Sequence, residues 1–197
     1  MKINFSGDVK SYMARIILSL ALSSLFLMPL NASGAEIIGP DARVMNDEIV
    51  VSTGLTLDEK NISDLKNGIS KEITFHIDLF RVWRWWADEF IAGKKIVTTL
   101  RCDPIKEEYT ATSFDGATLI KKRFKRFDSM LDWTLTINDL KLINVKELQT
   151  SDYYVKVTVE SRLRQLPPII GYLLFFVPEK DFKLSKDSPS LAAGSEK

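Results

Sequence analysis

The stretch Lys71–Val82, KEITFHIDLFRV, alternates between polar and apolar side chains from Glu72 to Leu79. Successive side chains of a β-strand point to opposite faces, so the pattern predicts a strand with one face in the core and the other toward water. The stretch Tyr153–Arg164, YYVKVTVESRLR, shows the same alternation. These two long segments predict a sheet that is buried on one face.

Shorter segments around these two predict the rest of the fold. Further strands are expected at Ala42–Met45, Glu48–Thr53, Lys94–Arg101, Glu107–Thr112 and Leu140–Leu148. One short helix is expected over Asp58–Gly68, which opens with an N-capping Asp and closes with Asn-Gly, and a second from Asp128. Strands at this spacing indicate a sandwich or barrel, and we expect a mainly β fold, an antiparallel β-sandwich of about seven to nine strands.

The start of the chain predicts export. Basic residues precede the apolar run Ile16–Leu30, and small residues follow it, with Ser33 and Ala35 placed as a signal peptidase requires for cleavage before Glu36. The run is shorter than the roughly 20 residues of a spanning helix. We therefore expect a cleaved signal peptide and a periplasmic protein, and an uncleaved membrane anchor is the alternative.

The domain organisation follows from these signals. We expect a signal peptide over residues 1–35, a single β-sandwich domain over 36–185 and a disordered tail over 186–197, which lacks periodicity. The 197 residues include 27 Lys and Arg against 26 Asp and Glu. This balance argues against a nucleic-acid binder, because such domains are usually clearly basic.

An unusual aromatic segment, Phe80–Phe90 or FRVWRWWADEF, holds most of the tryptophans of the chain. If the strand alternation continues, Trp83 and Trp85 lie in the core with Leu79, and Trp86 faces outward. Packing is then the main role of the indoles, because aromatic side chains dominate core burial.

The same segment is also a candidate binding site. Indoles flanked by arginines can stack on a planar or sugar ligand, hold a protein partner or lie at a membrane interface. The candidate binding residues are Arg81, Trp83, Arg84, Trp85 and Trp86. Packing and binding remain alternatives at this point.

Two further segments have a structural and a functional interpretation. The basic run Lys121–Arg126 is either a solvated surface or a contact for anionic lipid headgroups or an acidic partner. The apolar run Ile169–Val177 is too short to span a bilayer. It is either a core element or a patch for peripheral membrane contact or a partner.

Few residues are suited to catalysis. The chain has one Cys and one His, and it contains no GxSxG, HExxH, phosphate-loop or calcium-loop motif. His76 falls on the polar face of its strand without a catalytic neighbour, and Cys102 is expected to be a buried small hydrophobic residue. We therefore expect a protein that is not an enzyme and that has no metal or cofactor.

Several stretches occur in an order that resembles a known family. They are Asp64–Ile69, Thr74–Arg81, Arg81–Asp88, Leu100 with Tyr109, Leu131–Trp133 and Tyr154–Val159 through Leu166–Pro167. Over about residues 40–185 this set resembles the DUF4390 family of uncharacterised secreted bacterial proteins. The family usually ends in a Trp-rich tail, where this chain has Phe182–Ser185 without Trp. The resemblance implies a Gram-negative envelope protein, with a hint of envelope signalling and no catalytic residues.

The expected function is therefore that of a non-catalytic binding or scaffolding module. Its partner would be an unknown envelope protein or an apolar ligand, not a nucleic acid. The alternative is a periplasmic carrier of a lipid or other apolar ligand, in a cavity lined by Phe75, Trp83, Trp85 and Phe175. A pocket of about 300–1,000 Å³ would favour the carrier.

Overall fold

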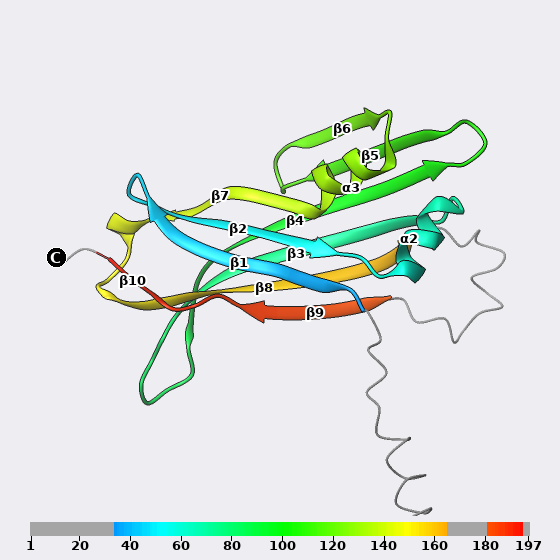
Figure 1. Cartoon of the computed structure of the whole chain (residues 1–197). Coiled ribbons are helices and arrows are strands. Elements are labelled where there is room, and N and C mark those ends of the chain that lie inside the picture. Colours follow the sequence, from blue (N-terminus) through cyan, green and yellow to red (C-terminus); the bar gives the residue numbers. More distant parts are fainter. Residues whose placement is uncertain (1–33, 165–180, 195–197) are drawn as a thin grey trace, which may run out of the picture. The chain divides into compact units, whose positions relative to one another are not determined.

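The computed structural model describes residues 34–164 and 181–194 (Figure 1). The predicted signal peptide, apart from its last two residues, and the apolar run Ile169–Val177 lie outside this part of the chain. The strands are β1 (Glu36–Met45), β2 (Glu48–Thr56), β3 (Ser70–Arg81), β4 (Glu89–Asp103), β5 (Glu108–Phe114), β6 (Leu119–Phe124), β7 (Thr136–Asn144), β8 (Ser151–Arg164), β9 (Phe182–Asp187) and β10 (Leu191–Ala193). The helices are α2 (Glu59–Lys66), α3 (Phe127–Leu135) and the 3-10 helix η1 (Val145–Glu147).

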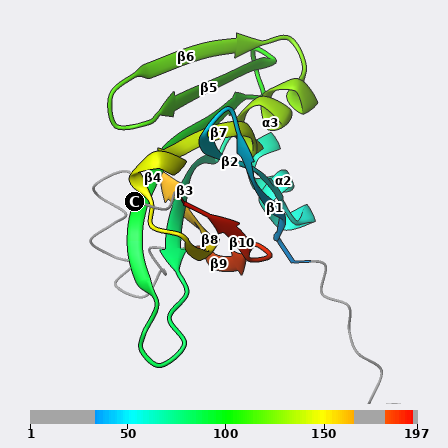
Figure 2. The same cartoon turned by 90° about the vertical axis from the view of Figure 1, so that its left-hand side faces the viewer.

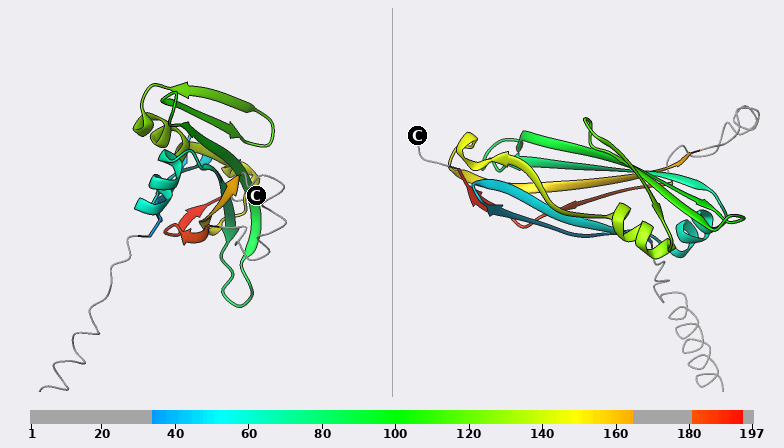
Figure 3. Two further views of the ribbon diagram at one scale, coloured as in Figure 1. Left: turned by 90° about the vertical axis from the view of Figure 1, so that its right-hand side faces the viewer. Right: turned by 90° about the horizontal axis from the view of Figure 1, so that it is seen from above.

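The strands form two antiparallel sheets. The smaller sheet has the order β1-β2-β7, and the larger has the order β10-β8-β3-β4-β5-β6, with β9 also paired to β8. The smaller sheet lies over one face of the larger (Figure 3). The predicted mainly β, sandwich-like fold with two short α-helices is therefore confirmed. The described residues form ten strands instead of seven to nine, because β6 arises from the basic run and β9 and β10 from the end of the chain.

The core lies between the sheets, and the alternation of β3 and β8 positions it. The apolar residues of β3 from Ile73 to Leu79 are fully buried, as are Val155, Val157 and Val159 of β8. The two strands pair along their whole length. The residues between the apolar ones face outward, as the pattern predicts.

Both α-helices pack against the core, α2 against the start of β3 and the neighbouring β4, and α3 mainly against β4, β5 and β6 (Figure 1). The carboxylate of Asp58 caps α2 by accepting a hydrogen bond from the Asn61 backbone N–H at 2.7 Å, as predicted. Leu65 of α2 and Met130 of α3 are fully buried. Within the described residues, neither helix has the length and apolarity needed to cross a membrane.

The prediction of a disordered tail is wrong for residues 186–194. Strand β9 continues to Asp187, and β10 pairs with β8. Between them, Ser188 donates its backbone N–H to Val155 O at 2.8 Å and accepts the Val155 N–H on its Oγ at 2.9 Å. A short edge strand is held by backbone hydrogen bonds, which nearly any residue supplies, so it leaves no periodic pattern.

Candidate functional site

The loop between β3 and β4 contains the aromatic segment. Strand β3 ends at Arg81 and β4 begins at Glu89. Figure 2 shows this loop projecting beyond the neighbouring strands. We call Arg81–Phe90 the aromatic hairpin. Because the strand ends before Trp83, the alternation that would place the tryptophans in the core does not continue.

The side chains of the aromatic hairpin are exposed. The exposed fraction is 48% for Trp83, 88% for Trp85, 83% for Trp86 and 57% for Phe90. The packing interpretation, with Trp83 and Trp85 beside Leu79 in the core, is therefore wrong. The structure brings the predicted binding residues together on one accessible loop.

Arg81 holds the base of the hairpin in place through contacts with neighbouring side chains, which we call the brace. Its guanidinium forms an ion pair with Glu89, donates a hydrogen bond to the side chain of Gln149 and lies 4.6 Å from the ring centroid of Trp83. The Trp83 indole N–H donates to the same Glu89 carboxylate at 3.3 Å. Only 13% of the Arg81 side chain is exposed, so Arg81 positions the loop and offers little surface to a partner.

Asp88 ties the loop to itself and to β8. One carboxylate oxygen accepts the backbone N–H of Trp83 at 3.1 Å, and the other accepts the hydroxyl of Tyr154 at 3.1 Å. Burial, and then the hydrogen bond to Asp88, raise the pKa of the Tyr154 hydroxyl. The hydroxyl therefore stays a donor at neutral pH, and the tie is kept.

Three residues at the tip remain without a partner. Arg84, Trp85 and Trp86 make no hydrogen bond, ion pair or ring contact with any other residue that the structure describes. Both acids of the loop, Asp88 and Glu89, are engaged at its base. The tip thus presents two indoles and one uncompensated guanidinium on a braced support.

Three aromatic residues outside the predicted binding set extend this surface, Phe80 and Phe90 from the two ends of the aromatic segment and Tyr154 from β8. On the outer face of the larger sheet, Phe80 stacks on Tyr154 with centroids 5.5 Å apart and meets Phe90 edge-on at 5.9 Å. The ammonium of Lys156 lies 5.6 Å from the Phe80 ring centroid. The sequence did contain a signal, because Phe80 and Tyr154 occupy outward-facing positions of their strands.

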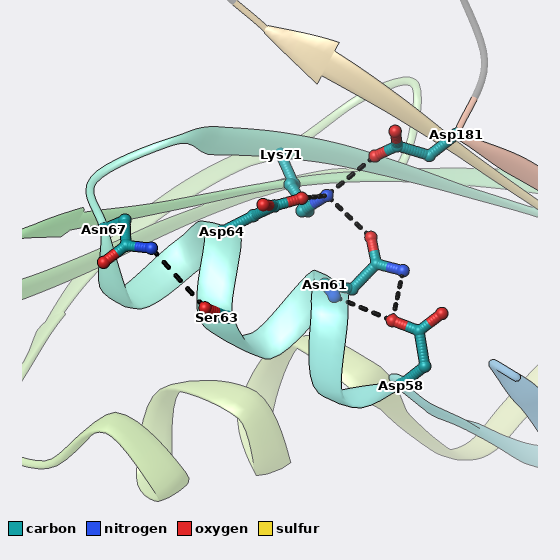
Figure 4. Close-up of polar contacts among 7 residues, drawn as sticks. All are labelled: Asp58, Asn61, Ser63, Asp64, Asn67, Lys71 and Asp181. Atoms are coloured by element: carbon teal, nitrogen blue, oxygen red, sulfur yellow. Dashed lines mark hydrogen bonds and ion pairs between the residues drawn. The ribbon is translucent and has the colours of Figure 1, made fainter. Parts of the chain in front are cut away.

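A second polar cluster lies near the start of β3, away from the hairpin. The side chain of Lys71 is fully buried, and its ammonium contacts Asn61 at 2.6 Å, Asp64 at 3.0 Å and Asp181 at 2.7 Å (Figure 4). We call these four residues the Lys71 cluster. An ammonium has three N–H donors, and here each has an acceptor.

The Lys71 cluster links separate elements of the fold, and its ammonium is not placed to bind a ligand or transfer a proton. It joins β3, α2 and the residue that precedes β9, and its ammonium has neither a free donor nor contact with solvent. The sequence held a signal for it as well. Lys71 has the same parity as Ile73 in the alternation of β3, so a charged side chain in the core was predictable.

A cleft of about 470 Å³ opens beside β4, where β5 leaves it. Its walls include Ile96, Val97, Phe114 and Leu140, from β4, β5 and β7. It is not the predicted cavity. Of the residues expected to line that cavity, Phe75 is fully buried in the core and Trp83 and Trp85 are exposed, and Phe175 lies outside the described residues.

The remaining candidates add no reactive centre. Cys102 is buried, as predicted, and burial raises the pKa of its thiol to about 11, so little of the reactive thiolate exists at neutral pH. The basic side chains of Lys121–Arg126 are exposed on and after β6. The described part of the chain has no group of three or more His, Cys, Asp or Glu side chains that could hold a metal ion.

The comparisons with known proteins identify the family. The family model DUF4390, described as a domain of unknown function, matches residues 32–188, which include the aromatic hairpin, the Lys71 cluster and the cleft. No curated protein and no solved structure gives a significant match. The resemblance found in the sequence is thus confirmed, and the chain belongs to the DUF4390 family.

Proposed function

We propose that this protein is a non-catalytic binding or scaffolding module of the cell envelope and that the aromatic hairpin is its contact surface. The observation that carries the proposal is the exposure of Trp85 and Trp86, at 88% and 83%, in a loop that is braced at its base. Leaving two indoles in water forgoes the free energy of burying them. Tryptophan and arginine are also the residues most often found at the energetic centre of binding interfaces.

The brace supports a binding role for a second reason. A loop already held in one conformation loses less conformational entropy when a partner binds. Arg81 and Asp88 supply that order without occupying the tip, because both contact the base of the hairpin. Within residues 34–164 and 181–194, the exposed groups of the tip have no polar or ring partner, so they are available to another molecule.

The location in the envelope rests on the start of the chain. The basic residues and the apolar run Ile16–Leu30 support export to the periplasm. The family resemblance adds the link to envelope signalling. Fractionation of cells that produce the full chain tests the location, and recovery of the intact chain in the cytosol would contradict it.

Site-specific photo-cross-linking in living cells tests the contact surface. A photoreactive amino acid placed at Trp86 is expected to give a defined adduct. The control is the same amino acid at Ile105, which is 93% exposed on the turn between β4 and β5. Adducts of equal yield from both positions, or none from Trp86, would contradict the proposal.

The cleft beside β4 supports a second candidate function, the carriage of a small apolar ligand. Its volume of about 470 Å³ falls within the usual range of ligand sites, about 300–1,000 Å³. The dye N-phenyl-1-naphthylamine should then bind with increased fluorescence, and Leu140→Trp should reduce its binding by filling the cleft. Dye binding that Leu140→Trp leaves unchanged would rule out this site.

A further inference from the structure

We infer that the aromatic hairpin binds the headgroup layer of a phospholipid bilayer that contains anionic lipid. This inference rests on the proposed function, since it takes the hairpin as the contact surface and names its partner. Three observations support it: the high exposure of the tip, the placement of charge in the hairpin and the projection of the loop.

The exposed groups at the tip match the interfacial zone of a membrane. Tryptophan is enriched there because its ring is apolar while its N–H needs a polar partner. The tip presents Trp85 and Trp86, and Val82 is the one aliphatic side chain of the loop among the exposed large hydrophobic residues, so the tip suits the headgroup region better than the hydrocarbon interior. Trp83 and Phe90, about half exposed, lie behind them.

The charges of the hairpin favour an anionic surface. Glu89 is paired with Arg81, and Asp88 accepts hydrogen bonds from Trp83 and Tyr154, so both carboxylates are held at the base. The guanidinium of Arg84 has no partner among the described residues and can bind a lipid phosphate through two N–H groups. Over residues 80–96 the chain has four basic and two acidic side chains, so this region is positive overall.

The projection of the loop also favours a membrane over a protein. The loop extends beyond the neighbouring strands (Figures 2 and 3), and the cleft beside β4 does not include it. A projecting tip can enter a deformable headgroup layer directly. A protein partner would need a complementary pocket to bury the same indoles.

The outer face of the larger sheet supplies a second level of contact. Phe80, Phe90 and Tyr154 form a connected aromatic group behind the tip, with Lys156 over it. The ammonium of Lys156 lies 3.9 Å from a carboxylate oxygen of Asp187 in an exposed ion pair. Such a pair is weak in water, so the ammonium can exchange this carboxylate for a lipid phosphate once the tip is inserted. The adjoining face of the larger sheet thus adds aromatic rings and one cation to those of the hairpin.

Tryptophan fluorescence with vesicles tests the inference on the purified protein lacking residues 1–35. Vesicles of phosphatidylethanolamine and phosphatidylglycerol should shift the emission to shorter wavelength and sediment the protein. Vesicles of phosphatidylcholine alone should do so less. Brominated lipid should quench the indoles that enter the headgroup layer. Trp133, which is half-buried against Phe124, should not be quenched.

Two variants and one control make the test specific. Trp85→Ser with Trp86→Ser should weaken vesicle binding by roughly tenfold or more, because most of the buried apolar area is lost. Arg84→Gln should remove most of the preference for phosphatidylglycerol. Ile105→Ser, at an equally exposed position on another turn, should bind as the unmodified protein does. Circular dichroism spectra confirm that each variant is folded.

The possible outcomes separate the inference from the proposed function. If the folded protein does not bind vesicles, or if the double tryptophan variant binds equally well, the inference is wrong. If vesicle binding fails while a photoreactive residue at position 86 cross-links to a protein, the partner is a protein and the proposed function stands. If both experiments fail, the aromatic hairpin is not a contact surface and both proposals fall.

Discussion

Near its start, strand β3 has a buried lysine, and at its end it leads into a loop of exposed tryptophans. At one end a charged side chain is buried, and at the other apolar side chains face water. The side chain of Lys71 is fully buried, whereas that of Trp85 is 88% exposed. Both arrangements are unfavourable taken alone, because a buried charge loses its hydration and an exposed indole orders water. They differ in whether the protein itself compensates for the cost.

At the Lys71 cluster the compensation is internal. Every donor of the ammonium has an acceptor among Asn61, Asp64 and Asp181, so nothing is left for another molecule. At the aromatic hairpin the base is compensated in the same way, but among the residues that the structure describes Arg84, Trp85 and Trp86 have no such partner. A side chain whose unfavourable burial or exposure is not offset by other residues of the protein is the stronger candidate for a functional contact. Variants of single residues test this rule.

The largest effect on stability is expected from Lys71→Met. Removing the ammonium leaves the carboxylates of Asp64 and Asp181 and the amide of Asn61 facing an apolar side chain. We expect the free energy of unfolding to fall by about 3 kcal/mol, as for other broken buried ion pairs. Urea unfolding measures it.

The control for this prediction is Lys60→Met, at an exposed position of α2, the helix that supplies Asn61 and Asp64 to the cluster. It should change the free energy of unfolding by no more than about 0.5 kcal/mol. If Lys71→Met lowers the free energy of unfolding no more than Lys60→Met does, the Lys71 cluster does not stabilise the fold. The two ends of β3 would then not differ in the way described.

Ser188→Ala should have the next largest effect. The Ser188 hydroxyl accepts the buried N–H of Val155, in the gap between β9 and β10. Without it a buried donor has no acceptor, which costs about 1–3 kcal/mol. Thermal and urea unfolding should show the loss, whereas Ser190→Ala, at an exposed position nearby, should be neutral. Equal stability of the two variants would show that water replaces the hydroxyl.

The two arginines of the aromatic hairpin should differ in their effect on stability, although both effects are smaller than those above. Arg81→Met removes the ion pair with Glu89 and the hydrogen bond to Gln149, and it should lower the free energy of unfolding by about 1 kcal/mol. Arg84→Met removes no internal contact and should leave stability unchanged while weakening binding. Vesicle binding and urea unfolding are measured on both variants. A stability loss for Arg84→Met would show that Arg84 is also part of the brace.

The sequence predicted the sheet because burial there follows a period of two. The alternation of β3 and β8 assigned Phe75 and Val157 to the core, and both are fully buried. It could not predict β10, which has three residues and is held by backbone hydrogen bonds. A strand of that length shows too few side chains for a period to emerge.

The candidate site was predicted in its residues but not in its conformation. The density of Trp and Arg marked Arg81–Trp86, whereas extending the alternation past Arg81 placed Trp83 and Trp85 in the core. The strand ends there because Asp88 and Glu89 turn back to bind Trp83, Arg81 and Tyr154. The contact between Asp88 and Tyr154 joins residues 66 positions apart, and the alternation of side chains carries no information about such a contact.

Cys102, on β4 near Lys71, allows a test of burial through the pH dependence of stability, with a smaller expected effect. Burial raises the pKa of its thiol from 9.0 to about 11. Between these values the unfolded chain has lost the thiol proton while the folded protein keeps it, so the free energy of unfolding should fall as pH rises through this window. Urea unfolding of the unmodified protein and of Cys102→Ala, compared below and within the window, isolates the effect. An equal pH dependence of both would show that the thiol is not desolvated.

The smallest effect on stability is expected from Trp85→Ser combined with Trp86→Ser. This variant decides whether the aromatic hairpin differs from the Lys71 cluster. Both indoles are more than four-fifths exposed and have no hydrogen-bond or ring partner among the described residues, so the change in the free energy of unfolding should stay within about 0.5 kcal/mol. The same variant should lose vesicle binding. A marked loss of stability would mean that the indoles pack in solution, and the hairpin would then resemble the Lys71 cluster, compensated by its own fold. Unchanged stability with lost binding would mean that the compensation comes from another molecule.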